Sequence, residues 1–173
     1  MVIAVGCVLV SAGARRASAS GHAVSRTALT YLSDQIGQYE RATWRWQSVM
    51  GVPRTHTAGR VLAEMSVPDL RQAVRLWLRR ALAARLQATH PPHLREWLCI
   101  HHYEGSWTDA GAPYYGGLQM NLGFQQTYGG WLYARKGTAD HWTPLEQIWT
   151  AEKALRSRGF WPWPNTARFC GLI

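Results

Sequence analysis

Hydrophobic residues, joined by one threonine, recur at helical spacing in two long segments of the chain. Those of the first segment are Leu29, Leu32, Ile36, Tyr39, Thr43, Trp46 and Met50. Those of the second segment are Leu70, Val74, Trp77, Leu78, Ala81, Leu82 and Leu86. Steps of mostly three and four residues place each set along one face of a helix. We expect the two apolar faces to pack against each other as a helical hairpin.

Turn and cap residues predict where the helices of this hairpin begin and end. Ser66 followed by Asp69 forms a capping-box pattern that starts the second helix, and the dipeptide Pro91-Pro92 ends it. Glycine and proline residues interrupt the chain between the two helices. The hairpin is expected to occupy residues 20–92, either resting on the rest of the chain or standing apart as a spacer.

A shorter amphipathic pattern opens the last part of the chain. Its apolar face consists of Leu94, Trp97, Leu98 and His101. This spacing predicts a short helix that ends at Glu104, where Gly105 stops it. Farther along, Thr143 and Glu146 around a proline form the start of another helix, with N-cap and capping-box acid, which ends near Gly159.

The remaining segments predict turns. The glycine-aromatic tract 114–119 predicts a short β or turn element, and the proline-rich run 161–165 is expected to be non-helical and to lead back toward the last cysteine. The predicted fold is mainly α. A small domain over residues 93–173 carries the short β/turn element and follows the helical hairpin, which in turn follows an N-terminal signal segment over residues 1–19.

That signal segment is predicted from its apolar start. Residues 1–14 are uncharged and mostly apolar but too short to span a bilayer comfortably. The tripeptide Ala17-Ser18-Ala19 matches the pattern of small residues at a signal cleavage site, which makes Ser20 the first residue after cleavage. Two arginines follow the apolar run instead of preceding it, so an uncleaved anchor or a mis-set start stay as alternatives.

Cysteine usage agrees with export. Removal of the leader would take Cys7 with it and leave an even pair, Cys99 and Cys170, in an oxidising compartment. We expect these two residues to form a disulfide that ties the start of the C-terminal domain to its end. The alternative is two separate buried thiols.

Composition and charge narrow the class of partner. The 173 residues are 47% hydrophobic, which is enough for a packed domain with extra segments. A net charge of +9 favours an anionic partner such as nucleic acid, anionic lipid or acidic wall polymer. Seven of the ten tryptophans lie from Trp97 onward, and no RNA-binding or helix-turn-helix motif accompanies them. Indoles stack on sugar faces, so a glycan is the favoured partner and nucleic acid is not expected.

The predicted hairpin carries its own basic residues. Arg71, Arg75 and Arg79 recur every four residues and form a stripe, which is either a solvated helix face or a contact for anionic wall polymer or lipid. Trp44 and Trp46 lie beside arginines in the first helix and could contact a ligand, but packing in the core is favoured.

Glu104 is the main candidate for catalysis. It is expected at the C-terminal end of a helix, where the helix dipole disfavours negative charge, and it is flanked in sequence by Trp97 and Trp107. A carboxyl in such a place keeps a proton available near neutral pH, as a general acid must. The alternative is a solvated acid at a helix end.

The tract after Glu104 is suited to sugar binding. Tyr114 and Tyr115 offer planar surfaces, Gly117 lets the backbone approach a ligand closely, and Gln119 both donates and accepts hydrogen bonds. An ordinary turn would use similar residues.

These motifs together resemble the transglycosylase-like domain of actinobacterial resuscitation-promoting factors. The resemblance covers roughly Leu94 to Leu172 and comprises the run up to Trp107, the tyrosine-glycine tract, the segment from Glu146 to Glu152 and the final Pro-Trp-Pro before a cysteine. It implies a compact, mainly helical, lysozyme-like fold. It also implies an enzyme that cuts the glycan strands of peptidoglycan. It does not cover the hairpin.

The same resemblance implies roles for single residues. Glu104 corresponds to the catalytic acid of the family. Tyr115, Gly117 and Gln119 fall on the substrate-groove motif, to which we add Tyr114 and Trp107 as candidate substrate-binding residues. Cys99 and Cys170 fall on the family's disulfide.

The sequence departs from that family next to the catalytic acid. In the better-known members the cysteine directly precedes the glutamate, whereas Ile100 to Tyr103 intervene here. Four residues are about one helical turn, so Cys99 keeps nearly the same face. The adjacent His101 and His102 point about 100° apart on a helix and are poorly placed to share one metal ion. No metal or cofactor is expected.

One convincing acid favours a lytic transglycosylase over a hydrolase. Retaining and inverting glycosidases use two carboxylates, and the candidate second acid, Asp109, also lies in a typical turn sequence. We expect a secreted or wall-associated monomer that cleaves peptidoglycan between N-acetylmuramic acid and N-acetylglucosamine. A muramidase-type hydrolase and a catalytically weak wall-binding or signalling module are the alternatives.

Overall fold

The protein is mainly helical. The structure, a computed structural model, describes residues 14–56 and 64–173, so most of the predicted signal segment, residues 1–19, lies outside the described residues. The elements are α1 (Ala14–Met50), α2 (Val67–Thr89), α3 (Leu94–Glu104), β1 (Tyr114–Tyr115), β2 (Met120–Asn121), α4 (Leu122–Lys136), the 3₁₀ turn η2 (Ala139–His141), α5 (Pro144–Arg158) and α6 (Pro164–Phe169). The two strands form a small antiparallel sheet. The predicted fold class, mainly α with a short β element, is confirmed.

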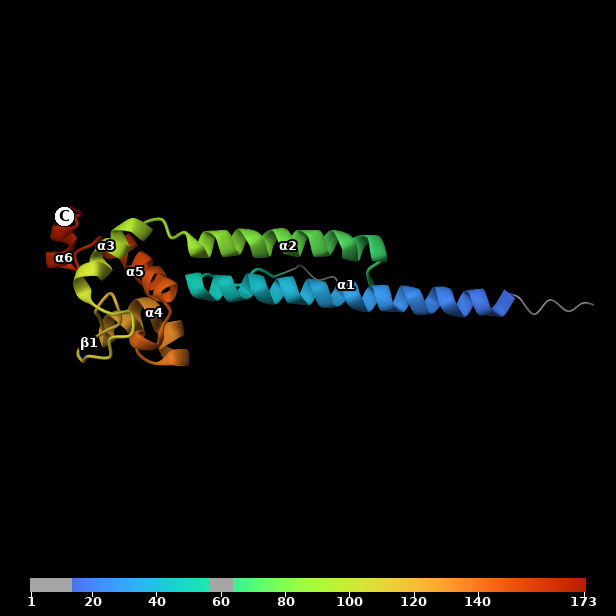
Figure 1. Cartoon of the computed structure of the whole chain (residues 1–173), viewed down its shortest axis with the longest axis horizontal. Helices are drawn as coiled ribbons and strands as arrows, with labels where there is room; N and C mark the ends of the chain where they lie inside the picture. Colours follow the sequence, from blue (N-terminus) through green and yellow to red (C-terminus); the bar gives the residue numbers. More distant parts are fainter. Residues whose placement is uncertain (1–13, 57–63) are drawn as a thin grey trace, which may run out of the picture.

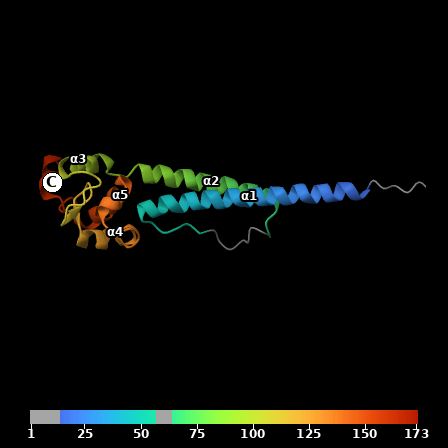
Figure 2. The ribbon, with the colours of Figure 1, turned by 60° about the horizontal axis from the view of Figure 1, so that its bottom comes forward.

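Helices α1 and α2 lie side by side and project from the unit that α3 to α6 form (Figures 1 and 2). The side chain of Ser66 caps α2 by accepting a hydrogen bond from the backbone of Asp69. Ile36 of α1 packs with Leu70 and Trp77 of α2, and all three are almost fully buried. The predicted hairpin is therefore present. Within the described residues, no helix combines the length and the apolar character that a membrane span needs.

The face that α2 turns toward α1 differs in part from the prediction. Buried positions on α2 are Leu70, Trp77, Ala81, Ala84 and Ala88. Leu78, Leu82 and Leu86 had been assigned to the same face, but Leu82 and Leu86 are 56% and 64% exposed. Small alanine side chains let two helices approach closely, so the alanine face packs against α1. The leucines lie on the outward side, where Arg71 and Arg75 are also exposed.

The base of the hairpin is attached to the C-terminal domain. Met50 of α1 and Ala88 of α2 are buried against Trp149 of α5. The Trp149 indole donates a hydrogen bond to the carbonyl oxygen of Ala88 (2.8 Å), and the Trp131 indole donates one to that of Ser48 (2.9 Å). These carbonyl groups lie in the last turns of α2 and α1, where helices lack intrahelical donors. The hairpin therefore rests on the domain at its base and does not stand apart.

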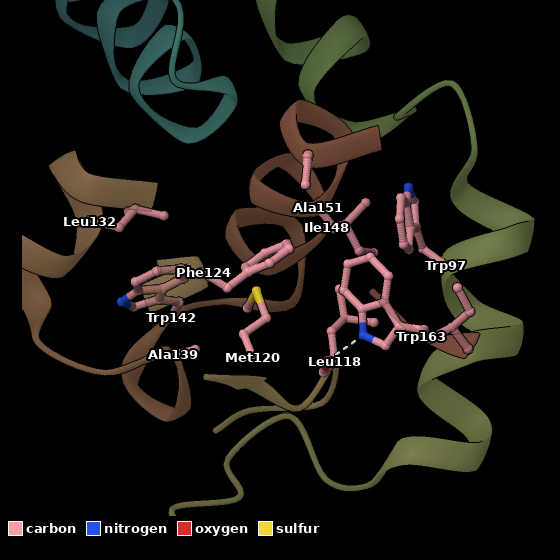
Figure 3. Packing of buried hydrophobic residues seen from close by; sticks show 12 residues of the cluster. Trp97, Leu118, Met120, Phe124, Leu132, Ala139, Trp142, Ile148, Ala151 and Trp163 are labelled. Carbon is pink, nitrogen blue, oxygen red and sulfur yellow. Dashed lines mark hydrogen bonds between the residues drawn. The ribbon is translucent and has the colours of Figure 1, made fainter. Parts of the chain in front are cut away.

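The core of the domain is built around tryptophans (Figure 3). Trp97 of α3, Trp142 and Trp163 are at most 4% exposed and pack with apolar residues of the β hairpin, α4 and α5. The Trp163 indole donates to the carbonyl oxygen of Leu118 (2.6 Å), which fixes the turn between β1 and β2 to the core. The Trp97 indole donates to the buried carboxylate of Glu152 (3.0 Å).

Helix α5 begins as the sequence predicts. Thr143 and Glu146 form a capping box in which each side chain accepts a hydrogen bond from the other's backbone N–H. Lys136 of α4 also donates to Glu146, at 2.6 and 2.7 Å. Burial raises the pKa of the Glu146 carboxyl, but the hydrogen bonds from Lys136 and Thr143 outweigh burial and hold the pKa below its usual value. Glu146 is thus ionised at neutral pH and has a structural role.

The final segment joins the end of the chain to α3. Cys99 of α3 and Cys170, directly after α6, form the predicted disulfide, with Cα atoms 6.0 Å apart. The run 161–165 was expected to be non-helical, which is wrong for its last two residues. Pro164 is the first residue of α6, because proline lacks only an N–H that a first-turn residue does not use.

Candidate active site

Glu104 is the last residue of α3 and is half-buried. Gly105 follows in a conformation with φ of 150°, and its N–H bonds to the carbonyl oxygen of His101 (3.3 Å). A side chain rarely adopts that φ, so glycine is favoured at this stop. The helix therefore ends as predicted and leaves the Glu104 carboxyl at its C-terminal edge.

A hydroxyl from the far end of the sequence holds the Glu104 carboxyl. Thr166 of α6 donates a hydrogen bond to Glu104 Oε1 at 2.8 Å, and Thr166 itself is only 8% exposed. The disulfide between Cys99 and Cys170 also joins α3 to the residue directly after α6. A buried donor on a covalently fixed helix restricts the orientation of the Glu104 carboxyl. No sequence pattern had assigned a role to Thr166.

Asp109 and Gln119 lie directly beside this helix end. A Cβ atom placed on Gly105 would be 3.6 Å from both Asp109 Oδ2 and Gln119 Nε2. These two atoms are hydrogen-bonded to each other at 2.9 Å. The structure thus pairs two of the predicted site residues, Asp109 and Gln119, beside the helix end that carries Glu104.

Asp109 also stabilises its own turn. Its Oδ1 atom accepts a hydrogen bond from the N–H of Gly111 (2.9 Å), and its carbonyl oxygen accepts one from the N–H of Gly116 (2.7 Å). Each carboxylate oxygen of Asp109 therefore already accepts a protein hydrogen bond. This arrangement is the turn that the sequence suggested as the alternative to a catalytic role.

Gln119 adopts a backbone conformation that is uncommon for its type. Its φ is 46°, and it is the one non-glycine residue with positive φ in the described part of the chain. The left-handed region costs a side chain roughly 1 to 2 kcal/mol. Hydrogen bonds from the Gln119 backbone N–H and Nε2 to the carbonyl oxygen of Gly116 (3.0 and 2.9 Å) hold the turn in this form. Such strain is often found at functional sites.

The two glycines of the tract are enclosed by protein atoms. A Cβ atom on Gly116 would meet Gln147 Oε1, and one on Gly117 would meet the rings of His101 and Trp107. Both glycines are buried. Packing of the protein against itself explains why glycine stands at each position, and contact between Gly117 and a ligand stays a prediction.

The aromatic candidates differ in exposure. Tyr114 of β1 is 49% exposed, whereas Tyr115 is half-buried and packs against the core. Trp107 stacks on His101, with ring centres 3.9 Å apart and planes at 22°. One face of the Trp107 ring is therefore covered by the His101 ring. His101 also bonds through Nδ1 to the carbonyl oxygen of Gly117 (3.1 Å). Tyr114 is the aromatic ring of the tract that is most available to a ligand.

Gln147 connects the site to the core, although no sequence motif assigns it a role. Its Oε1 atom accepts a hydrogen bond from the N–H of Gly117 (2.8 Å). Its Nε2 atom lies within 3.1 Å of the carbonyl oxygens of Trp107, Ala139 and Trp142. This fully buried amide therefore joins the loop after α3, the β hairpin and η2. A polar residue on the buried face of a helix is the pattern that could have revealed it.

The sequence matches no protein-family model and no curated protein. The resemblance to resuscitation-promoting factors therefore stays a prediction that depends on the order of the motifs. The site itself is defined by its geometry. A half-buried carboxyl at the end of α3 is held by a threonine hydroxyl, and the residue after it lies beside a hydrogen-bonded aspartate-glutamine pair. Strand β1 carries an exposed tyrosine.

Proposed function

We propose that this chain is a secreted enzyme that cleaves the glycan strands of peptidoglycan, with Glu104 as the general acid. The bond cut is the β-1,4 bond between N-acetylmuramic acid and N-acetylglucosamine. The observation that carries the proposal is the setting of Glu104. Its carboxyl is fixed by the buried Thr166 hydroxyl at 2.8 Å, and the Asp109–Gln119 pair lies next to Gly105, the residue that follows Glu104. Fixed orientation of an acid is what proton transfer to a glycosidic oxygen requires.

The chemistry needs one carboxyl. Thr166 occupies Oε1 of Glu104, so the proton to be transferred is carried on Oε2. Glu104 gives this proton to the glycosidic oxygen as the bond to C1 of the muramic acid breaks. The resulting carboxylate then takes the proton of the muramic acid 6-hydroxyl, and O6 bonds to C1 to close an anhydro ring. No water enters the product, and the acid returns to its protonated state.

The neighbouring residues supply contacts to the sugar. The exposed ring of Tyr114 offers a stacking surface for a sugar face. Gln119 uses its Nε2 atom for Asp109 and Gly116, which leaves its amide oxygen to accept hydrogen bonds from hydroxyl or N-acetyl groups. The two hydrogen bonds of Nε2 keep this amide in one orientation. Substrate binding is thus assigned to the β hairpin and catalysis to the end of α3.

A hydrolase is the second candidate because Asp109 lies so close to the helix end. In that scheme Asp109 activates water or stabilises the developing charge. Both of its carboxylate oxygens already accept hydrogen bonds, from Gly111 and Gln119. That engagement favours a positioning role for Asp109, and therefore the transglycosylase.

The products of peptidoglycan digestion test this proposal. Purified peptidoglycan is incubated with the wild type and with Glu104→Gln, and the soluble products are analysed by mass spectrometry. We expect anhydro-ended muropeptides from the wild type and at least ~100-fold less from Glu104→Gln, since general acid catalysis contributes about that much or more. The matched control is Glu96→Gln, in the first turn of the same helix, which should cleave like the wild type.

Other outcomes separate the alternatives. Reducing-end products that Glu104→Gln no longer releases would identify a hydrolase that uses a second acid. Absence of release by any of the proteins, on peptidoglycan that lysozyme digests, would reject the enzyme and leave a wall-binding module.

A further inference from the structure

A cleft lies between the base of the hairpin and the C-terminal domain. Its volume is about 590 Å³, and its walls come from the end of α1, the segment that follows α1, the end of α4 and the start of α5. This volume is in the range of about 300 to 1,000 Å³ that is usual for ligand sites. None of its lining residues belongs to the segment 104–119 that forms the candidate active site. The cleft is therefore separate from the candidate active site and lies where the two parts of the molecule meet.

The charge of the cleft is strongly positive. It is lined by Arg41, Arg45, Arg54, Arg135 and Lys136 and by one carboxylate, that of Glu146. Glu146 is already engaged by Lys136 at 2.6 Å. Within residues 14–56 and 64–173, the four arginines form no ion pair with a carboxylate. Four guanidinium groups around one cleft are therefore uncompensated.

Hydrogen bonds fix part of this lining. The indole of Trp44 donates to the carbonyl oxygen of Thr55 (2.8 Å), and the amide of Gln47 bonds both the N–H and the hydroxyl of Thr55. These bonds hold the segment after α1 against the helix. As a result, the Arg54 guanidinium lies over the Trp44 ring, 5.5 Å from its centre. A guanidinium ordered in this way loses less conformational freedom when it binds an anion.

A second guanidinium is arranged in the same manner. Arg45 lies over the ring of Trp46, also 5.5 Å from its centre. In both pairs a face of the indole is covered by a guanidinium, which leaves less ring surface for stacked nucleic-acid bases. What the cleft offers is a group of planar donors suited to carboxylate or phosphate.

We infer that this cleft binds an anionic glycan, through the carboxylate or phosphate groups that such a polymer carries. The choice of a glycan among anionic polymers rests on the proposed function, because the substrate of that function is itself a sugar polymer with carboxylates on its peptide stems. The arginines bind the acidic groups, and the indoles beneath them form the apolar floor. Bound there, the glycan holds the enzyme on its polymeric substrate independently of Glu104.

Binding by the full chain tests the inference. Glu104→Gln serves as the background, so that cleavage does not alter the ligand. The probes are a hexasaccharide of alternating glucuronate and N-acetylglucosamine, a poly(glycerol phosphate), the uncharged N-acetylglucosamine hexamer and an oligothymidylate. Titration by tryptophan fluorescence should give affinity for one or both acidic polymers at least ~10-fold above that for the uncharged hexamer. The tighter of the two acidic probes identifies the charged group that the cleft prefers.

A matched pair of double variants locates the site. Arg45→Gln with Arg135→Gln removes two charges from the cleft, and Arg71→Gln with Arg75→Gln removes two from exposed positions of α2. We expect the cleft variant to lose ~10-fold or more in affinity for the acidic probe and the α2 variant less than ~2-fold. Circular dichroism checks that both remain folded, which is expected because all four side chains are exposed.

Several results would overturn the inference. Equal losses of affinity in the two double variants would mean that the acidic probe binds through the overall charge of the protein and not in the cleft. Absence of binding to both acidic probes would exclude anionic glycans as the ligand. Tighter binding of the oligothymidylate would make the cleft a nucleic-acid site. These results are distinct from failure of the proposed function, because the cleavage assay depends on Glu104 and the binding assay does not.

Discussion

The hydroxyl of Thr166 is expected to matter more for catalysis than for folding. Thr166→Val keeps the shape of the side chain but removes the donor to Glu104 Oε1. One hydrogen bond to a carboxyl is worth about 1.5 kcal/mol, so kcat should fall roughly 10-fold with little change in KM. Release of soluble muropeptides over time, at several substrate concentrations, measures both constants.

Thr166→Ser is the matched variant, because it keeps the hydroxyl and should keep most of the activity. Thermal unfolding of both variants shows whether the second, longer hydrogen bond of Thr166 to the carbonyl oxygen of Trp163 (3.4 Å) contributes to stability. A Thr166→Val enzyme with wild-type kcat would remove Thr166 from the mechanism.

The sequence predicted some of the candidate site and missed the residues that support it. Glu104, Asp109 and Gln119 were singled out from local motifs, and the structure pairs Asp109 with Gln119 beside the helix end that carries Glu104. Thr166 and Gln147 were not, because their partners lie 62 and 30 residues away along the chain. Helix periodicity describes which face of a helix is buried, but it does not say which distant groups meet that face.

For the helices, too, the sequence predicted features that depend on neighbouring residues better than features that depend on tertiary packing. The caps at Ser66, Thr143 and Gly105 were predicted, because a cap depends on residues within one turn of it. The packing face of α2 was predicted only in part. Leu82 and Leu86 are good core residues by type, but the buried face of α2 carries Leu70, Trp77 and three alanines instead. Which of the two apolar faces of α2 is buried depends on the shape of the partner helix α1. The periodicity of the α2 sequence contains no information about that shape.

Lys153 of α5 should make stability depend on pH. Burial of the Lys153 ammonium, and then the nearby charge of Arg156, lower its pKa to about 8. The Trp131 ring, 3.4 Å away, favours the charged form and opposes this shift. The unfolded value is about 10.4. Between pH 8 and that value the unfolded chain binds more protons than the folded one, so the free energy of unfolding rises with pH.

Urea unfolding at pH 7, 8, 9 and 10 measures this effect. Across this range we expect the free energy of unfolding of the wild type to rise by roughly 1 to 2 kcal/mol relative to that of Lys153→Met. Lys153→Met keeps most of the side-chain volume and contact with Trp131 while removing the charge. Parallel pH profiles of the two proteins would show that Lys153 has the same proton affinity in both states.

The disulfide constrains the whole C-terminal domain, because it joins the first helix of that domain to the end of its last. Cys99 and Cys170 are 71 residues apart in sequence. In the chain-entropy model, opening such a loop costs about 4 kcal/mol of stability. Cys99→Ser with Cys170→Ser should lower the free energy of unfolding by roughly 2 to 4 kcal/mol, measured by urea unfolding.

The same variant should also cleave peptidoglycan more slowly, since α3 carries Glu104 and α6 carries Thr166. Added dithiothreitol destabilises the wild type and serves as the control, because it should leave the double serine variant unchanged. Equal stability of the oxidised and reduced wild type would contradict the prediction.

The indoles of Trp131 and Trp149 attach the two hairpin helices to the domain at separate points, the carbonyl groups of Ser48 and Ala88. Two points of attachment fix the direction in which α1 leaves the domain (Figure 1). Helix α1 has 37 residues, and a helix of that length extends for about 55 Å. The length of α1 therefore sets the distance between the domain and the far end of this helix. Removing seven residues, about two turns, from its middle would bring its two ends about 10 Å closer while nearly preserving their relative rotation.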